Sequence, residues 1–395
     1  MRGQTVEVAG LWRGPDQARL DTALVRFEQE TGVDVRYSPT GPDITATLTA
    51  RIAEGTPPDV AILPSPGILA ELARRGVLKP LGERAEDLVR ENYAPAWQNL
   101  GSVEGTLFGV WVAAVNKSTM WSNPDSLREA GVDPPATWDE FLTTARTLAA
   151  EGITPVSIAG GDEWPLTDWF ENVYLRMAGP EQYDRLANHD IAWTDESVKA
   201  ALSVLGELWG DPTLIVDGAA TTNLATSVSQ ILETPPRGAI AYGAGLAASG
   251  TKDGASIAGE EARLFGFPSI RGIQNVVVGN GDVAVRLADG APAVALMEFL
   301  AHPKFGDVLA GPGFLSPNRR VNLNFYRDDA TRLSARALVE ADTFRFDLSD
   351  LQPVEFGGTP GRGMWRILRD FLLNPGDVEG TARQLEAAAA RAFDR

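Results

Sequence analysis

Residues 160–179, with the sequence GGDEWPLTDWFENVYLRMAG, hold two tryptophans, one tyrosine, one phenylalanine and four acidic side chains. If this segment is helical, Asp168 and Glu171 lie three positions apart and therefore on one face of the helix. The two carboxylates could form a catalytic pair, could bind sugar hydroxyls beside the stacking ring of Trp164, or could belong to an ordinary amphipathic helix. The rest of the chain has to separate these three hypotheses.

Geometry disfavours the catalytic hypothesis. A retaining glycosidase needs two carboxyl groups about 5–5.5 Å apart on opposite sides of the bond it cleaves. Helix neighbours at i and i+3 point the same way and cannot flank a bond. Thr167 is predicted to be the N-cap of this helix, and acidic residues in a first helical turn are stabilised by the helix dipole, which explains Glu171. No segment has the spacing of a phosphate-binding loop, so we expect that the protein is not an enzyme.

Composition excludes several other functions. A chain of 395 residues predicts two domains, and a net charge of −18 without a basic block makes nucleic acid or an anionic membrane an improbable partner. The absence of cysteine removes disulfides and thiolate chemistry, and the two histidines, His189 and His302, are too isolated for a zinc site or a histidine-based triad. We therefore expect neither a metal nor a cofactor. The first residues, MRGQTVEVAGLW, lack a signal-peptide pattern, as expected of a cytoplasmic protein or of a mature chain.

The first eighty residues alternate between strand and helix patterns. Strands are predicted at TVEVAGLW, VDVRYS and PDVAILP, and a segment with helical spacing of apolar residues follows each of them. Short connections in this order predict a parallel sheet covered by helices on both faces. Such sheets bind ligands at the carboxyl ends of their strands, which here lead into the loops 10–16, 38–43 and 63–67.

The chain changes character near residue 113 and becomes helix-rich. Apolar spacing predicts helices at 138–150, 167–178 and 195–209, and the Gly-rich segment 276–285 then predicts another strand followed by a helix. No low-complexity linker separates the two regions. This pattern is typical of two domains that exchange segments through several crossings.

Four segments carry a family resemblance, in order along the chain. They are FEQETGVDVRY at 27–37, ARIAEGTPPDVAILPSPGILAELARRGVLKPL at 50–81, GVDPPATWDEFLTTARTLAAEG at 131–152, and GDVAVRLADGAPAVALMEFLAHP with GPGFLSPNRRV within 281–321. Together they resemble the extracellular solute-binding proteins of ABC importers, in the carbohydrate-binding family that includes maltose-binding protein. The resemblance implies an α/β, two-lobed periplasmic-binding-protein fold of type II-like organisation, in which each lobe is a sheet covered by helices.

The resemblance also implies a domain division. Lobe one would comprise 1–112 plus 275–325 and lobe two 113–274 plus 326–395, joined by a hinge, with the ligand cleft between them. The start of the helix at 167–171, TDWFE, is similar to a subgroup often assigned α-glucosides or related oligosaccharides. One departure is Trp111, which stands where relatives usually have proline.

Strand ends and resemblance together predict a set of ligand-binding residues. Trp12 follows the first strand, Trp365 matches the family's C-terminal stacking aromatic, and Asp168 lies on a segment that faces the cleft in the family. The full set is Trp12, Arg13, Gly14, Asp43, Ser65, Trp111, Trp164, Asp168, Tyr242, Gly243, Gly245, Gly279, Asp282, Gly313 and Trp365. Trp138 and Trp209, at helical apolar spacing, are predicted to be core residues.

The implied function is capture of a neutral oligosaccharide, an α-glucoside-like di- or trisaccharide, and its delivery to the transmembrane permease of an ABC importer. The resemblance further implies a monomer located outside the cytoplasm, either free in the periplasm or held by a lipid at the outer face of the membrane. Two alternatives remain open. One is a binding protein for another polar solute, such as an amino sugar or a polyamine held by Asp43, Asp168 and Asp282. The other is a glycoside-processing enzyme.

Overall fold

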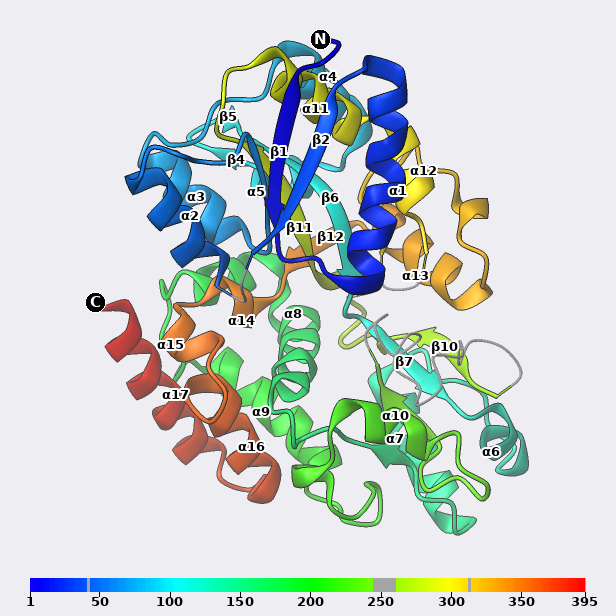
Figure 1. Cartoon of the computed structure of the whole chain (residues 1–395). Coiled ribbons are helices and arrows are strands. Elements are labelled where there is room, and N and C mark those ends of the chain that lie inside the picture. Colours follow the sequence, from blue (N-terminus) through cyan, green and yellow to red (C-terminus); the bar gives the residue numbers. More distant parts are fainter. Residues whose placement is uncertain (41–42, 244–260, 312–313, 395) are drawn as a thin grey trace. The chain divides into compact units, whose positions relative to one another are not determined.

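The computed structural model describes residues 1–40, 43–243, 261–311 and 314–394, and shows a mixed α/β protein (Figure 1). The chain divides into two compact units. Unit 1 comprises Met1–Val115 and Asn280–Arg327, and unit 2 comprises Asn116–Gly279 and Asp328–Arg395. The chain therefore passes between the units three times. The predicted residues Gly245 and Gly313 lie outside the described residues.

Unit 1 is built around parallel strands. Its elements are β1 (Thr5–Gly10), α1 (Gly14–Thr31), β2 (Asp34–Pro39), α2 (Ile44–Ala53), β3 (Val60–Leu63), α3 (Pro66–Arg74), α4 (Glu83–Asn92), α5 (Pro95–Leu100), β4 (Ser102–Val103), β5 (Thr106–Leu107), β6 (Gly109–Asn116), the later part of β11 (Val276–Arg286), α11 (Ala291–Ala301), α12 (Pro303–Leu309) and η3 (Leu323–Phe325). β1 pairs in parallel with both β2 and β3, and the end of β11 pairs antiparallel with β3. Figure 1 shows α1 on one side of β1 and β2, and α2 and α3 on the other.

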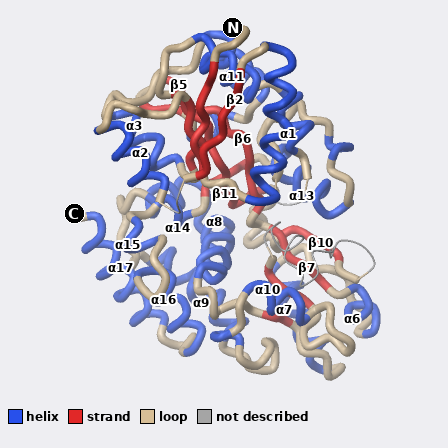
Figure 2. Tube along the Cα trace, in the orientation of Figure 1, coloured by secondary structure: helices blue, strands red, loops and turns tan. Residues whose placement is uncertain are grey.

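Unit 2 is richer in helix. Its elements are β7 (Thr119–Ser122), α6 (Pro124–Glu129), α7 (Trp138–Ala150), β8 (Val156–Ser157), α8 (Trp164–Ala187), α9 (Glu196–Trp209), η1 (Ala219–Thr221), α10 (Leu224–Gln230), β9 (Ile240–Tyr242), β10 (Arg263–Gly266), the start of β11, α13 (Asp329–Glu340), β12 (Thr343–Phe346), α14 (Leu348–Leu351), α15 (Val354–Gly357), α16 (Gly363–Leu373) and α17 (Val378–Phe393). A four-stranded sheet has the order β10-β7-β9-β8, and the start of β11 pairs in parallel with β12. Figure 2 shows the strands in red among these helices.

The sequence located α7 correctly. Thr137 caps it with a reciprocal capping box involving Glu140, which satisfies backbone N–H groups that the first turn leaves free. Trp138 and Trp209 are buried, which confirms their prediction as core residues. None of the helices among the described residues is long and apolar enough to cross a lipid bilayer.

The prediction for α8 was wrong at its start. The helix begins at Trp164, because Pro165 fits the first turn, where its missing N–H costs no hydrogen bond. Thr167 is therefore inside the helix and not its N-cap, and its hydroxyl donates to the Trp164 carbonyl at 2.7 Å. Trp164, expected in a preceding loop, is the first helical residue. The helix runs to Ala187 across a break at Gly179, where φ is 82°.

Candidate functional site

A first cluster of predicted residues lies at the carboxyl ends of the unit 1 strands. β1, β2 and β3 are parallel, so Trp12, Thr40 and Ser65, which follow them, lie at the same edge of the sheet. The indole Nε1 of Trp12 donates to Asp282 Oδ2 at 3.1 Å, and the Tyr37 hydroxyl donates to the Trp12 carbonyl at 3.0 Å. The ring of Trp12 meets Phe314 edge-on, with centroids 4.9 Å apart. We refer to Trp12 and Asp282 as the Trp12–Asp282 pair.

The Asp282 carboxylate reaches this edge because β11 runs antiparallel to β3. Val283 pairs with Leu63, the last residue of β3, so Asp282 lies just beyond that strand end. Its neighbour Gly281 permits the close approach, since a Cβ there would collide with the Ala113 carbonyl. Burial raises the pKa of Asp282 to about 6, against the opposing effect of the Trp12 hydrogen bond. A half-buried carboxylate held by an indole can accept a hydrogen bond from a ligand hydroxyl or ammonium group.

Other predicted residues of unit 1 have identifiable structural roles. Asp43 accepts from Ala46 N at 2.8 Å as the N-cap of α2, and Ser65 accepts from Ile68 N at 3.3 Å as the N-cap of α3. Arg13 Nη2 donates to the Thr40 carbonyl, and Gly14, with φ of 55°, begins α1. Trp111 is buried, with its ring 5.2 Å from that of Trp97. Contacts of these residues with a ligand stay predictions.

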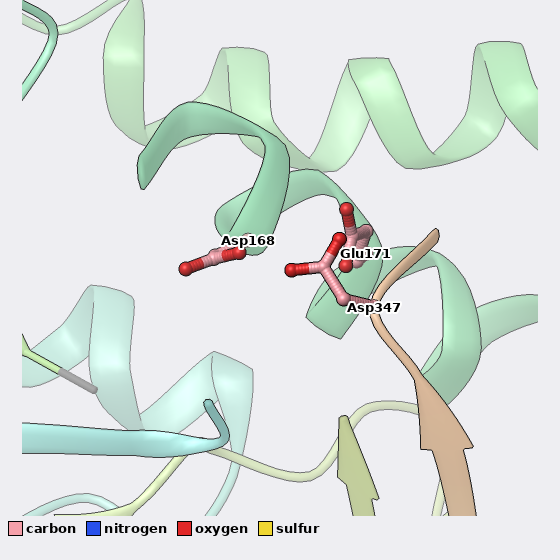
Figure 3. A group of neighbouring side chains, drawn as sticks. All are labelled: Asp168, Glu171 and Asp347. Carbon is pink, nitrogen blue, oxygen red and sulfur yellow. The ribbon is translucent and has the colours of Figure 1, made fainter. Parts of the chain in front are cut away.

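A second cluster is buried in unit 2. Figure 3 shows Asp168 and Glu171 on α8 and Asp347, just after β12, with the three carboxylates turned towards one another. The ammonium group of Lys117 pairs with Asp168 Oδ1 at 3.1 Å and also with Asp347 Oδ2. The Tyr242 hydroxyl donates to Asp168 Oδ2 at 2.7 Å. We call these five residues the Lys117 cluster.

The cluster has three acids and one lysine, so ionising all three acids would bury negative charge without enough positive charge and would cost free energy. Burial raises the pKa of Asp168 to about 7, and burial together with the charge of Asp347 raises the pKa of Glu171 well above its usual value. Burial acts to raise the pKa of Asp347 too, but Lys117 outweighs it and the pKa falls below its usual value. Lys117 therefore favours the ionised form of Asp347, whereas burial and the charge of Asp347 favour the neutral form of Glu171.

The arrangement bears on two predictions. Oxygen atoms of Asp168, Glu171 and Asp347 lie within 4.8 Å of one another, close enough to hold a metal ion. The Lys117 ammonium already supplies a positive charge to Asp168 and Asp347, so the carboxylates have a cation without a metal. Asp168, predicted to bind a ligand hydroxyl, has no exposed surface and is engaged by Lys117 and Tyr242. Its direct contact with a ligand stays a prediction, and its described contacts are structural.

The two tryptophans predicted for unit 2 are half-buried at helix starts. Trp164 begins α8, with Lys117 Nζ 5.3 Å from its ring centroid, and Trp365 lies in the first turn of α16. Glu163 joins the two segments, because it accepts from Gly361 N at 2.6 Å and from Arg369 Nη1 at 2.9 Å. The Gly243 carbonyl accepts from Trp121 Nε1 at 3.0 Å, and the Gly279 carbonyl accepts from Asp347 N at 2.8 Å.

Sequence reasoning missed Lys117, Asp347 and Glu163. Lys117 and Asp347 lie 230 positions apart, and neither belongs to a motif that marks it as charged and buried. The only local signal was the segment 108–123, FGVWVAAVNKSTMWSN, in which Lys117 is the single charged residue.

A mixed α/β chain that passes three times between two units, with ligand-type side chains at strand ends, has the organisation of a solute-binding protein. The family described as bacterial extracellular solute-binding protein matches residues 13–304, and this chain belongs to it. The predicted family and α/β fold are thereby confirmed. The protein is an extracellular solute-binding protein of the ABC-transporter type.

Two relatives match over nearly the whole chain. The osmoprotective compounds-binding protein GgtB of Synechocystis is 34% identical, covering 95% of this chain and 90% of its own. The alpha-glucosides-binding periplasmic protein AglE of Rhizobium meliloti is 32% identical, covering 94% and 84%. Among solved structures, the bacterial solute receptor AcbH has a TM-score of 0.83 at 16% identity, and RafE of Streptococcus pneumoniae has 0.82 at 17%. Each covers 99% of both chains and supports the fold.

We expect Lys117→Met to lower the free energy of unfolding by about 3–5 kcal/mol, because it leaves the ionised Asp347 buried without its cation. Adding Asp347→Asn to that variant removes the uncompensated charge and should restore a large part of the loss. Urea denaturation measures both changes. Lys199→Met, which removes a lysine from exposed ion pairs, is the control and should change the midpoint little. Equal effects at Lys117 and Lys199 would contradict the assignment.

We also expect a pH dependence of stability from Asp168. Its pKa is 3.8 ordinarily and about 7 in the folded protein, so between these values the folded state binds more protons than the unfolded state. The free energy of unfolding contributed by this group therefore falls as pH rises, by up to about 1.4 kcal/mol per pH unit. The free energy of unfolding of wild type and of Asp168→Asn is measured by denaturation from pH 5 to 8. We expect the value of wild type to fall relative to that of the variant as pH rises. A difference in free energy of unfolding that stays constant with pH would refute the raised pKa of Asp168.

Proposed function

We propose that this protein captures a neutral oligosaccharide, an α-glucoside-like di- or trisaccharide, and delivers it to the membrane permease of an ABC importer. The similarity to AglE, along nearly the whole chain, carries the proposal, because alpha-glucosides are what that relative is named for binding. The Trp12–Asp282 pair agrees with it, since it places an aromatic ring and a carboxylate together at the edge where α/β sheets bind ligands.

The chemistry of the pair suits an uncharged polyol. A sugar offers hydroxyl groups at its edge and C–H groups on its face, which call for hydrogen-bond acceptors and aromatic rings. Each aromatic contact contributes about 0.5–1.5 kcal/mol beyond area burial. Micromolar affinity requires about 8 kcal/mol, which a few aromatic contacts and several satisfied hydroxyls supply. Trp164 and Trp365, both half-buried, are the proposed aromatic contributions of unit 2.

The proposed mechanism is hinge closure. A ligand that contacts residues of both units binds a closed state more tightly than an open one, so binding shifts the population towards closure. The permease would then recognise the closed, loaded form. We further propose that the protein acts as a monomer outside the cytoplasm, because AglE is named a periplasmic protein and the family is described as extracellular.

A second candidate ligand class follows from GgtB, whose name describes binding of osmoprotective compounds. A screen separates the classes. Thermal unfolding is measured with maltose, trehalose, sucrose, amino sugars, polyamines and glycine betaine, since a ligand of the native state raises the midpoint by mass action. A saturable rise with α-glucosides alone supports the proposal, and a rise with a charged solute alone replaces it.

We expect Trp12→Ala and Asp282→Asn each to weaken binding of the responding sugar about tenfold or more in calorimetric titrations, because each removes a polar or stacking contact. Trp209→Phe, in the core of unit 2 and outside the proposed contacts, is the control and should retain affinity. A polyamine ligand would behave differently. Its binding would strengthen as pH rises through about 6, where Asp282 ionises, whereas binding of a neutral sugar would change far less.

We expect no hydrolysis of aryl α- or β-glucosides by the protein, because the two acids of α8 lie on one helix and both are fully buried. Release of the coloured aryl alcohol measures turnover directly. Buffer and the Asp168→Asn variant are the references. Turnover that Asp168→Asn abolishes would establish the alternative of a glycoside-processing enzyme.

A further inference from the structure

A pocket in unit 2 has none of the residues predicted to bind the sugar in its lining. Its volume is about 390 Å³, and it is lined by the segment before α7, the end of β10 with the loop that follows, and Arg176 of α8. The walls mix polar and apolar side chains, and the apolar ones include Pro134, Pro135, Phe265 and Ile273. The pocket therefore combines apolar surface with one cationic side chain.

Arg176 is buried, with 4% of its surface exposed. Its Nη1 donates to the carbonyl and the Oδ1 atom of Asn172, at 3.2 and 2.9 Å, and its Nη2 donates to the Val276 carbonyl at 2.9 Å. The guanidinium carbon lies 5.1 Å from the ring centroid of Phe267, another pocket residue. These partners hold the side chain in one orientation, and none of them carries a negative charge.

The charge of Arg176 is therefore uncompensated among the described residues, where no carboxylate pairs with it. This is unusual in a chain with 53 acidic and 35 basic residues. Lys117, another buried cation of unit 2, pairs with two carboxylates. Burial alone lowers the pKa of Arg176 to about 9, so the group keeps its charge at neutral pH. A buried charge without a counter-ion is costly.

The hydrogen bonds of Arg176 also leave part of the guanidinium available to a ligand. A guanidinium has five N–H groups, and the contacts to Asn172 and Val276 use three of them. Within the described parts of the chain, the Nε–H and one Nη2–H have no acceptor. An arginine can bind both oxygens of a carboxylate through its Nε–H and an Nη–H.

We propose that this pocket binds the carboxylate of a small organic acid, with Arg176 pairing the two oxygens and the apolar side chains of the walls contacting the rest of the molecule. A single guanidinium without a second cation suits a monoanion better than a phosphate dianion. This proposal does not depend on the proposed sugar site. A test that supports or refutes carboxylate binding therefore leaves the proposed sugar-binding function unchanged.

The test is calorimetric titration of the whole protein with benzoate and hexanoate as probes. Benzyl alcohol and hexanol, which lack the carboxylate, and inorganic phosphate, which lacks the apolar body, are the comparison ligands. We expect saturable binding of a carboxylate probe that is at least about tenfold tighter than binding of its alcohol or of phosphate. No saturable binding of either carboxylate, or equal binding of the alcohols or of phosphate, overturns the proposal.

Two glycines provide matched variants that keep the fold. Gly266 lines the pocket, and Gly376 lies outside it; at both, an added Cβ meets open space and φ is not positive. Gly266→Leu should weaken the carboxylate probe about tenfold or more by filling the pocket, and Gly376→Leu should not. Arg176→Lys, checked for folding by circular dichroism, should weaken it as well, since lysine cannot form the two-pronged pair. Unchanged binding in Gly266→Leu refutes the location, whatever Arg176→Lys does.

Discussion

The pairing of Lys117 with Asp347 is the interaction on which unit 2 depends most. Lys117 follows the first passage of the chain into the unit, and its backbone N–H donates to the Val278 carbonyl. Asp347 follows β12 and donates its own N–H to the Gly279 carbonyl, one residue before the chain leaves the unit again. A buried ion pair gains little over an apolar core, but breaking it is costly. It therefore fixes the relation of these segments to α8.

In unit 1 the comparable long-range interaction is the hydrogen bond from Trp12 to Asp282, which are 270 positions apart. It requires three parallel strands that end at one edge, and a β11 that returns antiparallel to β3. Small residues allow the return, as the closeness of Gly281 to Ala113 shows. The order of the strands thus brings Trp12 and Asp282 together.

Two buried cations in unit 2 differ in whether carboxylates neutralise their charge. Lys117 is neutralised inside the protein by acids from two other elements, which makes it structural. Arg176, on the same helix as two of the cluster's acids, contacts carbonyl and amide oxygens and an aromatic ring. The same helix therefore carries a closed charge network and, two turns further on, a cation that still lacks a counter-ion among the described residues.

The sequence by itself determined the α/β class, the family, the strands at the start of the chain and helices such as α7, because apolar period and capping residues such as Thr137 act locally. It also placed Trp12 at a strand end. It misjudged the start of α8, where Pro165 outweighed the Thr-Asp signal. Only the tertiary structure decided that Asp168 is buried, that Lys117 and Asp347 surround it, and that no carboxylate in the described part of the chain pairs with Arg176. The reason is physical: burial and charge pairing depend on residues brought together from distant parts of the chain, and no local pattern encodes them.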